Sequence, residues 1–345
     1  MKLLSIIIPT YNMEKYLEKC LNSLLIKENL EKLEILVIND GSKDQSLKIA
    51  QQYERQYPQI IRVIDKENGN YGSCINRGLK EATGKYIKIL DADDSYDTEL
   101  LNQYIKEIEN QNVDMIVNDF VLVNLENKEI STPYTYSFIP KKKISFLEYK
   151  DTNNIEKLCM HSVAYKRQNL IELNYVQTEG ISYTDIEWVF LPLTKVNSIY
   201  YFNKSLYRYL IGREGQTMSM DIYIKNSSQL LLILTKFINQ YINFHTPQYK
   251  EILKTRIIRD IVQLYRIYII EKFDKIEDLI KIDNILKKDC PDIYIETNNL
   301  KIFHIFKYVK EWRNHNREKQ SLTLKLGIIT NKVLKGIKRS IHKSL

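Results

Sequence analysis

Short apolar runs alternate with segments of helical periodicity through the first 120 residues of the chain. Residues 3–8 and 33–38 are almost continuously apolar, which is typical of strands buried on both faces of a parallel sheet. The segments between such runs repeat apolar residues at helical spacing, with Asn12 as a candidate N-cap of the first helix. This alternation predicts an α/β fold with a right-handed, doubly wound, mostly parallel sheet. The expected strands are residues 3–8, 33–38, 60–64, 84–90, 114–123 and 200–209, and the expected helices are residues 16–25, 44–57, 72–83 and 98–110.

The pattern changes in the second half of the chain. Residues 125–149 contain prolines and a run of three lysines, which suggests hairpins or irregular surface, and residues 157–173 fit a helix or a strand followed by a helix. Farther along, leucine and isoleucine recur within long helical segments that end near residue 315. We therefore expect three parts: a sheet domain over residues 1–220, a helical C-terminal domain over 221–318 and a tail over 319–345.

The tail is basic and amphipathic. No Asp or Glu follows Glu318, and the lysines and Arg339 lie opposite an apolar face of a helix over residues 322–345. Such a helix can lie in the interface of an anionic membrane, which we favour over a C-terminal helix docked on the domain. We expect no nucleic-acid partner. The apolar face consists of Leu322, Leu326, Ile329, Val333, Ile337 and Ile341.

Length and composition fit one large domain with an appendage. The 345 residues, 44% of them hydrophobic, suffice for a full core, and the net charge is +8. The four cysteines form neither a CxxC pair nor a Cys/His cluster, which indicates free thiols in a reducing cytosol. We see no signal peptide and no uncharged apolar run of about 18 residues, so we expect a cytoplasmic protein without a transmembrane helix.

Three acidic residues follow the strand predicted over residues 84–90. Asp91, Asp93 and Asp94 cannot share its buried surroundings, so the strand must deliver them to an open edge. Ligands bind at the carboxyl ends of parallel strands, and clustered oxygens suit a hard divalent cation that bridges phosphates. A metal–diphosphate site is the first hypothesis. The alternative is an acidic turn that caps the next helix through Asp94, Ser95 or Asp97.

Other strand ends bring polar groups to the same crevice. Thr10 and Tyr11 follow the first strand, Asp40 ends the second, and a glycine-spaced loop over residues 68–78 comes next. A nucleoside diphosphate would fit there, with Tyr11 near the base, Asp40 at a ribose hydroxyl or base edge, and a metal on Asp93. Neither a GxGxxG dinucleotide motif nor a P-loop is present, so nucleotide binding would depend on carboxylates and metal.

These crevice residues belong to four motifs in a fixed order: Pro9-Thr10-Tyr11-Asn12, then Asn39-Asp40-Gly41-Ser42, then the set Asn68, Gly72, Asn76 and Gly78, then Asp91-Ala92-Asp93-Asp94. The combination resembles the family 2 inverting glycosyltransferases, which have a GT-A-type fold. The resemblance implies sugar transfer from a nucleotide-sugar, most often UDP-linked, with Mn2+ or Mg2+ and inversion at the anomeric carbon. It implies metal ligation by Asp93, with Asp91 as a further candidate. It also implies that the nucleotide-sugar is bound by Pro9, Thr10, Tyr11, Asp40, Asn68, Gly72, Asn76, Asp91 and Ala92.

The resemblance also implies an acidic general base at a helix start in the second half of the domain, where residues 183–188 read Tyr-Thr-Asp-Ile-Glu-Trp. An inverting displacement needs a carboxylate opposite the leaving diphosphate to accept the proton of the acceptor hydroxyl. Asp185 is the preferred base. Glu187 and Glu179 are alternatives, because the family often has Glu-Asp where this chain has Thr184-Asp185. Asp185 could also be only a helix cap.

Two more residues are candidates for the site. Arg213 lies in a segment that resembles the family's late loop and could pair bidentately with the donor diphosphate, unless it is an ordinary surface arginine. His161 could contact the acceptor, although a lone histidine is more often structural. The Gln-x-x-Arg-Trp motif of processive members is absent, so we expect one sugar per encounter.

Together these features predict a peripheral enzyme on the inner face of the cell membrane. It would transfer one sugar to a saccharide or lipid-linked acceptor in cell-surface polysaccharide synthesis. Two alternatives remain. One is a sugar-phosphate nucleotidyltransferase, which usually opens with a glycine-rich, Arg- or Lys-bearing loop that this chain lacks. The other is a non-catalytic assembly protein that binds nucleotide-sugars.

Overall fold

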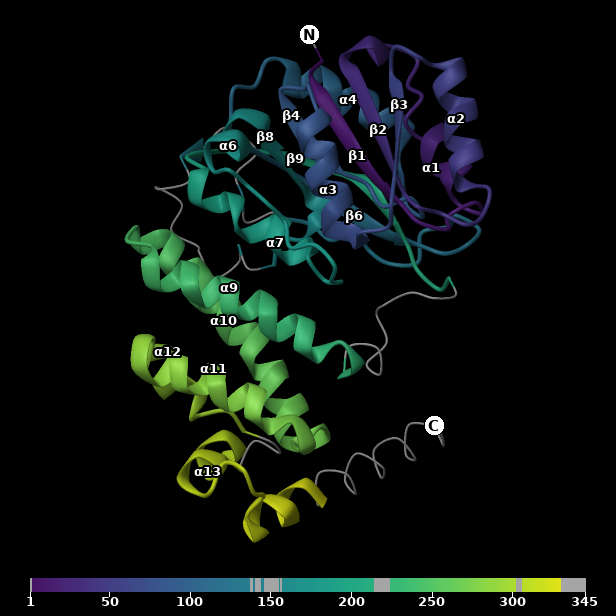
Figure 1. Cartoon of the computed structure of the whole chain (residues 1–345). Coiled ribbons are helices and arrows are strands. Elements are labelled where there is room, and N and C mark those ends of the chain that lie inside the picture. Colours follow the sequence, from purple (N-terminus) through teal and green to yellow (C-terminus); the bar gives the residue numbers. More distant parts are fainter. Residues whose placement is uncertain are drawn as a thin grey trace. The chain divides into compact units, whose positions relative to one another are not determined.

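The structure is a computed structural model that describes residues 2–136, 139, 144–145, 155, 157–213, 224–301 and 306–329. The chain divides into two compact units, residues 1–217 and 218–345, which we call the sheet unit and the helical unit (Figure 1).

The first half of the sheet unit is a parallel sheet in the order β3-β2-β1-β4. Every residue of β1 and β2 is buried, as their apolar runs predict. Helix α3 packs against both strands (Figure 1), and because the strands are parallel, their carboxyl ends meet at one edge. The strands are β1 (Leu4–Thr10), β2 (Leu33–Asp40), β3 (Ile61–Lys66) and β4 (Tyr86–Ile89), and the helices are α1 (Leu17–Asn22), α2 (Ser46–Gln56) and α3 (Asn70–Glu81).

The second half of the sheet is mixed. β8 pairs antiparallel with both β4 and β6, while β6 and β9 pair in parallel, and the short strands β5 and β7 pair antiparallel with β9. β8 belongs to the part of the chain after residue 123, where the alternation of strands and helices in the sequence is no longer regular. The strands are β5 (Ser95–Tyr96), β6 (Met115–Val123), β7 (Ile144–Ser145), β8 (Val163–Lys166) and β9 (Ser198–Leu210), and the helices are α4 (Thr98–Glu109), α6 (Arg167–Glu172) and α7 (Asp185–Phe190).

The helix caps differ in part from the sequence predictions. Asn12 does not cap α1, which begins at Leu17; instead its Oδ1 accepts a hydrogen bond of 2.8 Å from the Lys43 amide and ties the loops after β1 and β2 together. Asp97 does cap α4, because its carboxylate accepts a hydrogen bond of 3.0 Å from the Leu100 amide. The other acids of the 91–94 turn are therefore not needed as caps.

The helical unit packs α9 against α10 and α11. Asp283 of α11 is fully buried, pairs with Arg313 of α13 at 2.6 Å, and accepts a hydrogen bond of 2.5 Å from the Tyr265 hydroxyl of α10. The cluster joins three helices, and removing one of its partners would leave a buried charge uncompensated. Among the described residues, no helix combines the length and the apolar character that crossing a bilayer requires. The helices are α9 (Ser227–Asn243), α10 (Pro247–Arg266), α11 (Ile276–Asp289), α12 (Pro291–Thr297) and α13 (Tyr308–Asn314).

Candidate active site

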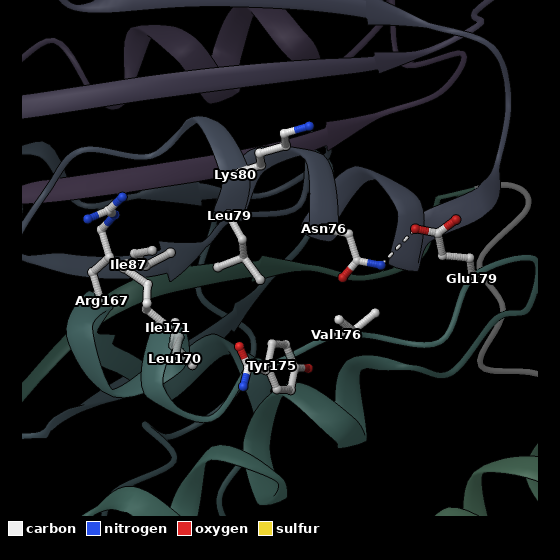
Figure 2. Close-up of a pocket in the computed structure, with 11 residues that line it drawn as sticks. Asn76, Leu79, Lys80, Ile87, Arg167, Leu170, Ile171, Tyr175, Val176 and Glu179 are labelled. Carbon is white, nitrogen blue, oxygen red and sulfur yellow. Dashed lines mark hydrogen bonds between the residues drawn. The ribbon is translucent and has the colours of Figure 1, made fainter.

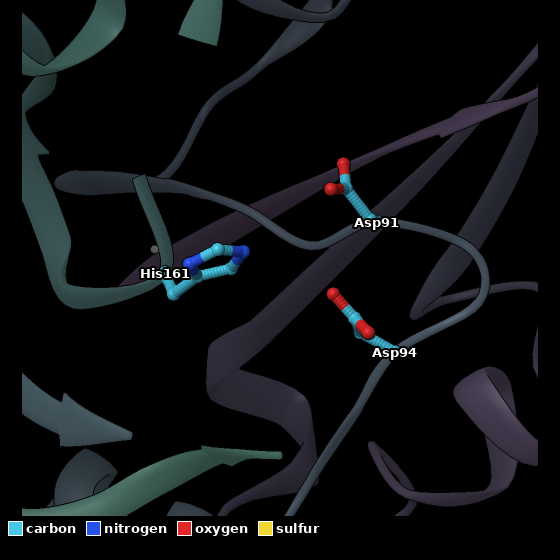
Figure 3. Close-up of side chains that lie close together, drawn as sticks. All are labelled: Asp91, Asp94 and His161. Carbon is cyan, nitrogen blue, oxygen red and sulfur yellow. The ribbon is translucent and has the colours of Figure 1, made fainter. Parts of the chain in front are cut away.

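The turn after β4 places acidic side chains beside a histidine from a distant part of the chain. Metal-ligating atoms of Asp91, Asp94 and His161 all lie within 4.8 Å of one another (Figure 3). His161 comes from the turn before β8, the neighbour of β4 in the sheet. The predicted acidic cluster is thus joined by an imidazole whose position the sequence could not give.

Asp94 is the most buried acid of this turn, with 2% of its surface exposed. Its two carboxylate oxygens accept hydrogen bonds from the Tyr207 hydroxyl at 2.5 Å and from the Leu210 amide at 2.7 Å. Burial, followed by the charges of Asp93 and Asp91, raises the pKa of Asp94 well above its usual value. Asp94 therefore anchors the end of β9 to the acidic turn.

Asp91 is held by a tyrosine that the sequence predictions missed. The Tyr71 hydroxyl, at the start of α3, donates a hydrogen bond of 2.9 Å to Asp91 Oδ1. Burial, followed by the charges of Asp93 and Asp185, raises the pKa of Asp91 to about 7. A cation bound beside this carboxylate would favour its ionised form. An aromatic residue within a glycine-spaced loop was the only signal for Tyr71 in the sequence.

Asp93 forms an ion pair with Arg213, which follows β9. Both side chains are largely buried, with 8% and 17% of their surface exposed, and the guanidinium lies 6.0 Å from the centre of the Tyr16 ring. The two residues predicted to bind metal and diphosphate are thus neighbours. Their roles toward those ligands stay predictions.

Asp185 is exposed at the first position of α7. Its charge contributes to the raised pKa of both Asp91 and Tyr71, so its carboxylate lies near the acidic turn. Two residues earlier, Tyr183 has a φ of +64°, a backbone conformation that is uncommon for bulky residues and that clusters at functional sites.

The alternative bases already have structural partners. Glu187 is fully buried, and its two oxygens accept hydrogen bonds from the amide and the hydroxyl of Thr178, at 2.7 and 2.6 Å. Glu179 Oε1 accepts a hydrogen bond of 2.7 Å from Asn76. Burial makes Glu187 poorly suited to meet an acceptor hydroxyl, whereas Asp185 and Glu179 are both exposed. The choice of Asp185 as base stays a prediction.

Residues 177–180, which we call the strap, lie across the start of α3. The side chain of Asn76 donates a hydrogen bond of 2.9 Å to the backbone carbonyl of Gln177 and accepts one of 2.8 Å from its backbone amide. The backbone amide of Gly180 donates a hydrogen bond of 3.1 Å to the carbonyl of Gly69. A Cβ atom on Gly72 would lie only 1.9 Å from the Thr178 carbonyl oxygen. Gly72 and Asn76 thus hold the strap, and direct contact of either with a nucleotide-sugar stays a prediction.

Replacing Gly72 with Ala should displace the strap. The added methyl meets backbone, which cannot rotate away, so we expect a loss of about 1–3 kcal/mol in the free energy of unfolding. Catalysis should fall with it, because the strap leads to Asp185. Urea unfolding and a sugar-transfer assay would measure both effects. Arg77→Ala, on an exposed position of the same helix, is the control; equal behaviour of the two variants would contradict this account.

Several of the residues predicted to contact the nucleotide lie where the first three strands end. In the strand register Thr10 pairs with Asn39, and Asp40 pairs with Lys66. Asp40 Oδ1 forms a 2.5 Å ion pair with Lys66 and accepts a 3.0 Å hydrogen bond from the Gly69 amide. Lys66 was missed by the sequence predictions, although it also stands at a strand end.

The other predicted nucleotide contacts lie on the same edge. Asn68 donates a hydrogen bond of 2.9 Å to the Asp40 carbonyl, and Tyr11 is 46% exposed, which leaves its ring available for stacking. Pro9 and Thr10 end β1 and are buried, as is Ala92. These three can contribute shape and backbone groups, while Tyr11 can contribute a side chain.

A buried lysine fixes the histidine of the site. Lys88 of β4 is fully buried and donates hydrogen bonds to Asn118 Oδ1 at 2.7 Å and to the His161 carbonyl at 3.0 Å. The His161 ring packs against Tyr209 and Tyr207, with centroid distances of 4.4 and 4.6 Å. Burial lowers the pKa of His161 to about 3, so the imidazole is neutral at physiological pH.

The donor set fits a divalent cation. Carboxylates suit Mg2+ and Mn2+, and a neutral imidazole next to them adds a nitrogen ligand that transition metals accept. Among the described residues, the group whose ligating atoms lie together is Asp91, Asp94 and His161, while Asp93 is paired with Arg213. Metal ligation by Asp93 stays a prediction.

Comparisons with known proteins agree on one family. The profile of "Glycosyl transferase family 2" matches residues 5–173. An uncharacterized glycosyltransferase of Mycoplasma pneumoniae, the MG025 homolog, is 30% identical over 251 residues, covering 69% of this chain and 78% of the relative. The uncharacterized glycosyltransferase MG025 of Mycoplasma genitalium is 31% identical over 219 residues, covering 62% of this chain and 70% of the relative.

Solved structures show the same fold. S. aureus TarS 1–349 in complex with UDP-GlcNAc superposes with a TM-score of 0.61 at 20% identity, over 91% of this chain and 92% of TarS. The mannosyltransferase PcManGT from Pyrobaculum calidifontis, in complex with GDP-Man and Mn2+, gives a TM-score of 0.52 at 14% identity, over 96% and 86% of the two chains. At these identities the likeness shows the GT-A fold.

Proposed function

Because the chain belongs to glycosyl transferase family 2 and is a glycosyltransferase, we propose that it transfers one sugar, with inversion, from a UDP-sugar to a saccharide or lipid-linked acceptor in cell-surface polysaccharide synthesis. The bound UDP-GlcNAc of TarS supports a UDP-sugar as donor. The observation that supports the proposal is the position of Asp185, exposed at the first position of α7 and near enough to Asp91 for its charge to act on that carboxylate.

In the proposed reaction, the Asp185 carboxylate accepts the proton of an acceptor hydroxyl. The hydroxyl oxygen forms a bond to the anomeric carbon, and the bond to the diphosphate breaks on the opposite face, with the electron pair leaving on UDP. Arg213 would bind the departing diphosphate oxygens. Mn2+ or Mg2+ held by Asp93, with Asp91, would offset the charge that develops on the leaving group.

UDP with Mn2+ should stabilise the protein against thermal unfolding. A ligand that binds only the folded state adds about 2.7 kcal/mol at a concentration one hundred times its Kd. The measurement is the unfolding midpoint with UDP, GDP, CMP or dTDP, each with and without Mn2+. We expect the largest rise with UDP plus Mn2+. No shift with any nucleotide would favour the non-catalytic alternative.

We further propose that residues 322–345 attach the enzyme to the anionic inner face of the cell membrane. In the described part of this segment, residues 322–329 are helical. Leu322, Leu326 and Ile329 are 74%, 57% and 58% exposed, while Leu324 and Ile328 are buried. An apolar stripe left in solvent at this spacing supports an interfacial helix. The remaining residues of the predicted face, Val333, Ile337 and Ile341, lie outside the described residues.

The full chain should therefore bind vesicles of phosphatidylglycerol and phosphatidylcholine better than vesicles of phosphatidylcholine alone. Each basic residue near an anionic surface contributes about 1 kcal/mol, and added salt should weaken this term. The triple variant Leu322→Ser, Leu326→Ser, Ile329→Ser should bind less in a cosedimentation assay. Equal binding by the variant, or binding to DNA but not to vesicles, would contradict the proposal.

A further inference from the structure

Tyr209, the next-to-last residue of β9, lies beside the acidic turn. That turn leads directly into β5, in which Ser95 pairs with Arg208 of β9. The register, continued by one residue, brings Asp94 beside Tyr209. The hydrogen bond from the Leu210 amide to the Asp94 carboxylate, at 2.7 Å, agrees with this placement. The sequence predictions gave Tyr209 no role.

The side chain of Tyr209 points to the same side of β9 as that of Tyr207, because side chains alternate along a strand. The Tyr207 hydroxyl donates a hydrogen bond to Asp94, and both rings pack against His161. His161 in turn lies next to Asp91 and Asp94 (Figure 3). Tyr209 therefore belongs to the wall of the candidate site, one step closer to the end of β9 than Tyr207.

The hydroxyl of Tyr209 is available to a ligand. It forms no hydrogen bond with any residue that the structure describes, and the side chain is only partly buried. Burial, followed by the negative charges of four nearby carboxylates, raises the pKa of this phenol, so it stays protonated and can donate a hydrogen bond. The four carboxylates belong to Asp94, Asp91, Asp93 and Asp185.

A cavity beside α3 is a less suitable place for the transferred sugar. It has a volume of about 450 Å³ and lies between α3, β4 and α6 (Figure 2). The described residues that line it include neither Asp185 nor an acid of the turn after β4. In an inverting transfer the sugar lies between the departing diphosphate and the base. The proposed roles of Asp93 and Asp185 therefore place the sugar near Tyr209 and not in this cavity.

We propose that the Tyr209 hydroxyl donates a hydrogen bond to the sugar that is transferred, and that it thereby contributes to the choice of donor. The sugar would lie between the acids proposed to face metal and diphosphate, Asp91 and Asp93, and the proposed base Asp185. Tyr209 is near enough to all three for their charges to act on it. The inference rests on the proposed function, because it takes a UDP-sugar as donor and Asp185 as base.

The test is the variant Tyr209→Phe, which removes the hydroxyl and keeps the ring against His161. Affinities of the full chain for UDP, UDP-GlcNAc, UDP-glucose and UDP-galactose would be measured by titration calorimetry with Mn2+ and without acceptor. At least one UDP-sugar should bind the unmodified protein more tightly than UDP does. Tyr209→Phe should bind that UDP-sugar about fivefold more weakly, the effect of one neutral hydrogen bond, and should bind UDP as tightly as before.

The matched control is Tyr200→Phe, on the same strand. It removes a hydroxyl that donates a hydrogen bond of 2.7 Å to Glu107 of α4, and both affinities should stay unchanged. The unfolding midpoint of Tyr209→Phe without ligand should also stay unchanged, because the lost hydroxyl has no partner among the described residues. A lower midpoint would indicate a structural role and overturn the proposal.

The remaining outcomes also decide the matter. Equal weakening of UDP and UDP-sugar would place the hydroxyl at the nucleotide or its diphosphate, and unchanged affinity for both would exclude a contact; either result overturns the proposal. If UDP binds but no UDP-sugar binds more tightly, only the sugar contact fails. If no nucleotide binds the unmodified protein, the proposed function fails as well.

Discussion

Asp185→Asn should lower kcat of sugar transfer by about 10²–10⁴-fold, the usual contribution of a positioned general base. An amide cannot accept the acceptor proton, yet it keeps the size of the side chain. Asp185 is exposed at the start of α7, so the substitution should cost at most about 1 kcal/mol of stability through the helix dipole. Stabilisation by UDP and Mn2+ should persist, because donor binding does not need the base.

The two neighbouring glutamates supply matched controls. Glu187→Gln places an NH2 group against the amide or hydroxyl of Thr178 and should destabilise the protein by about 1–3 kcal/mol. Glu179→Gln changes one contact with Asn76, and we expect less than about a tenfold change in kcat. If Glu179→Gln abolished transfer while Asp185→Asn did not, Glu179 would be the base.

Asp93→Asn should also remove most of the sugar-transfer activity, in this case by weakening metal binding. Loss of the metal ligand forfeits several kcal/mol of charge stabilisation in the transition state, or at least about a hundredfold in kcat/KM. Unlike Asp185→Asn, this variant should also lose the thermal stabilisation by UDP with Mn2+. The empty protein should keep its unfolding midpoint, because the substitution removes repulsion from Asp91 and Asp94 together with attraction to Arg213.

Asp97→Asn provides the comparison for this variant. It alters an acid of the same segment, but Asn also caps helices well, so activity and UDP binding should stay close to those of the unmodified protein. A normal response of Asp93→Asn to UDP and Mn2+ would rule out Asp93 as the metal ligand.

The parallel half of the fold could be predicted from the sequence because its signals are local. Strands β1 and β2 are buried along their whole length, and an apolar run encodes that directly. Asp97 was a candidate cap in the sequence because capping, too, depends on residues close together in the chain. The insertion of β8 between β4 and β6 could not be predicted, because strand order depends on pairing between distant segments.

The same contrast between local signals and contacts made only by folding applies to the candidate site. Acids at strand ends could be placed in one crevice by a general rule of parallel sheets. Contacts between separate elements could not be predicted: the approach of Gly72 to Thr178, the hydrogen bond between Tyr71 and Asp91, and the position of His161 beside that turn. Glu187 is the clearest case, since only the fold shows that its carboxylate is buried.

The ion pair between Asp93 and Arg213 has a thermodynamic consequence. If Asp93 holds the metal and Arg213 the diphosphate, as proposed, a divalent cation that binds alone would separate Asp93 from its guanidinium, and a diphosphate that binds alone would leave Asp93 without a partner. When both bind, each side chain exchanges one partner for another. Metal and nucleotide should therefore bind cooperatively, and by linkage the factor by which UDP raises the affinity for Mn2+ equals the factor by which Mn2+ raises the affinity for UDP.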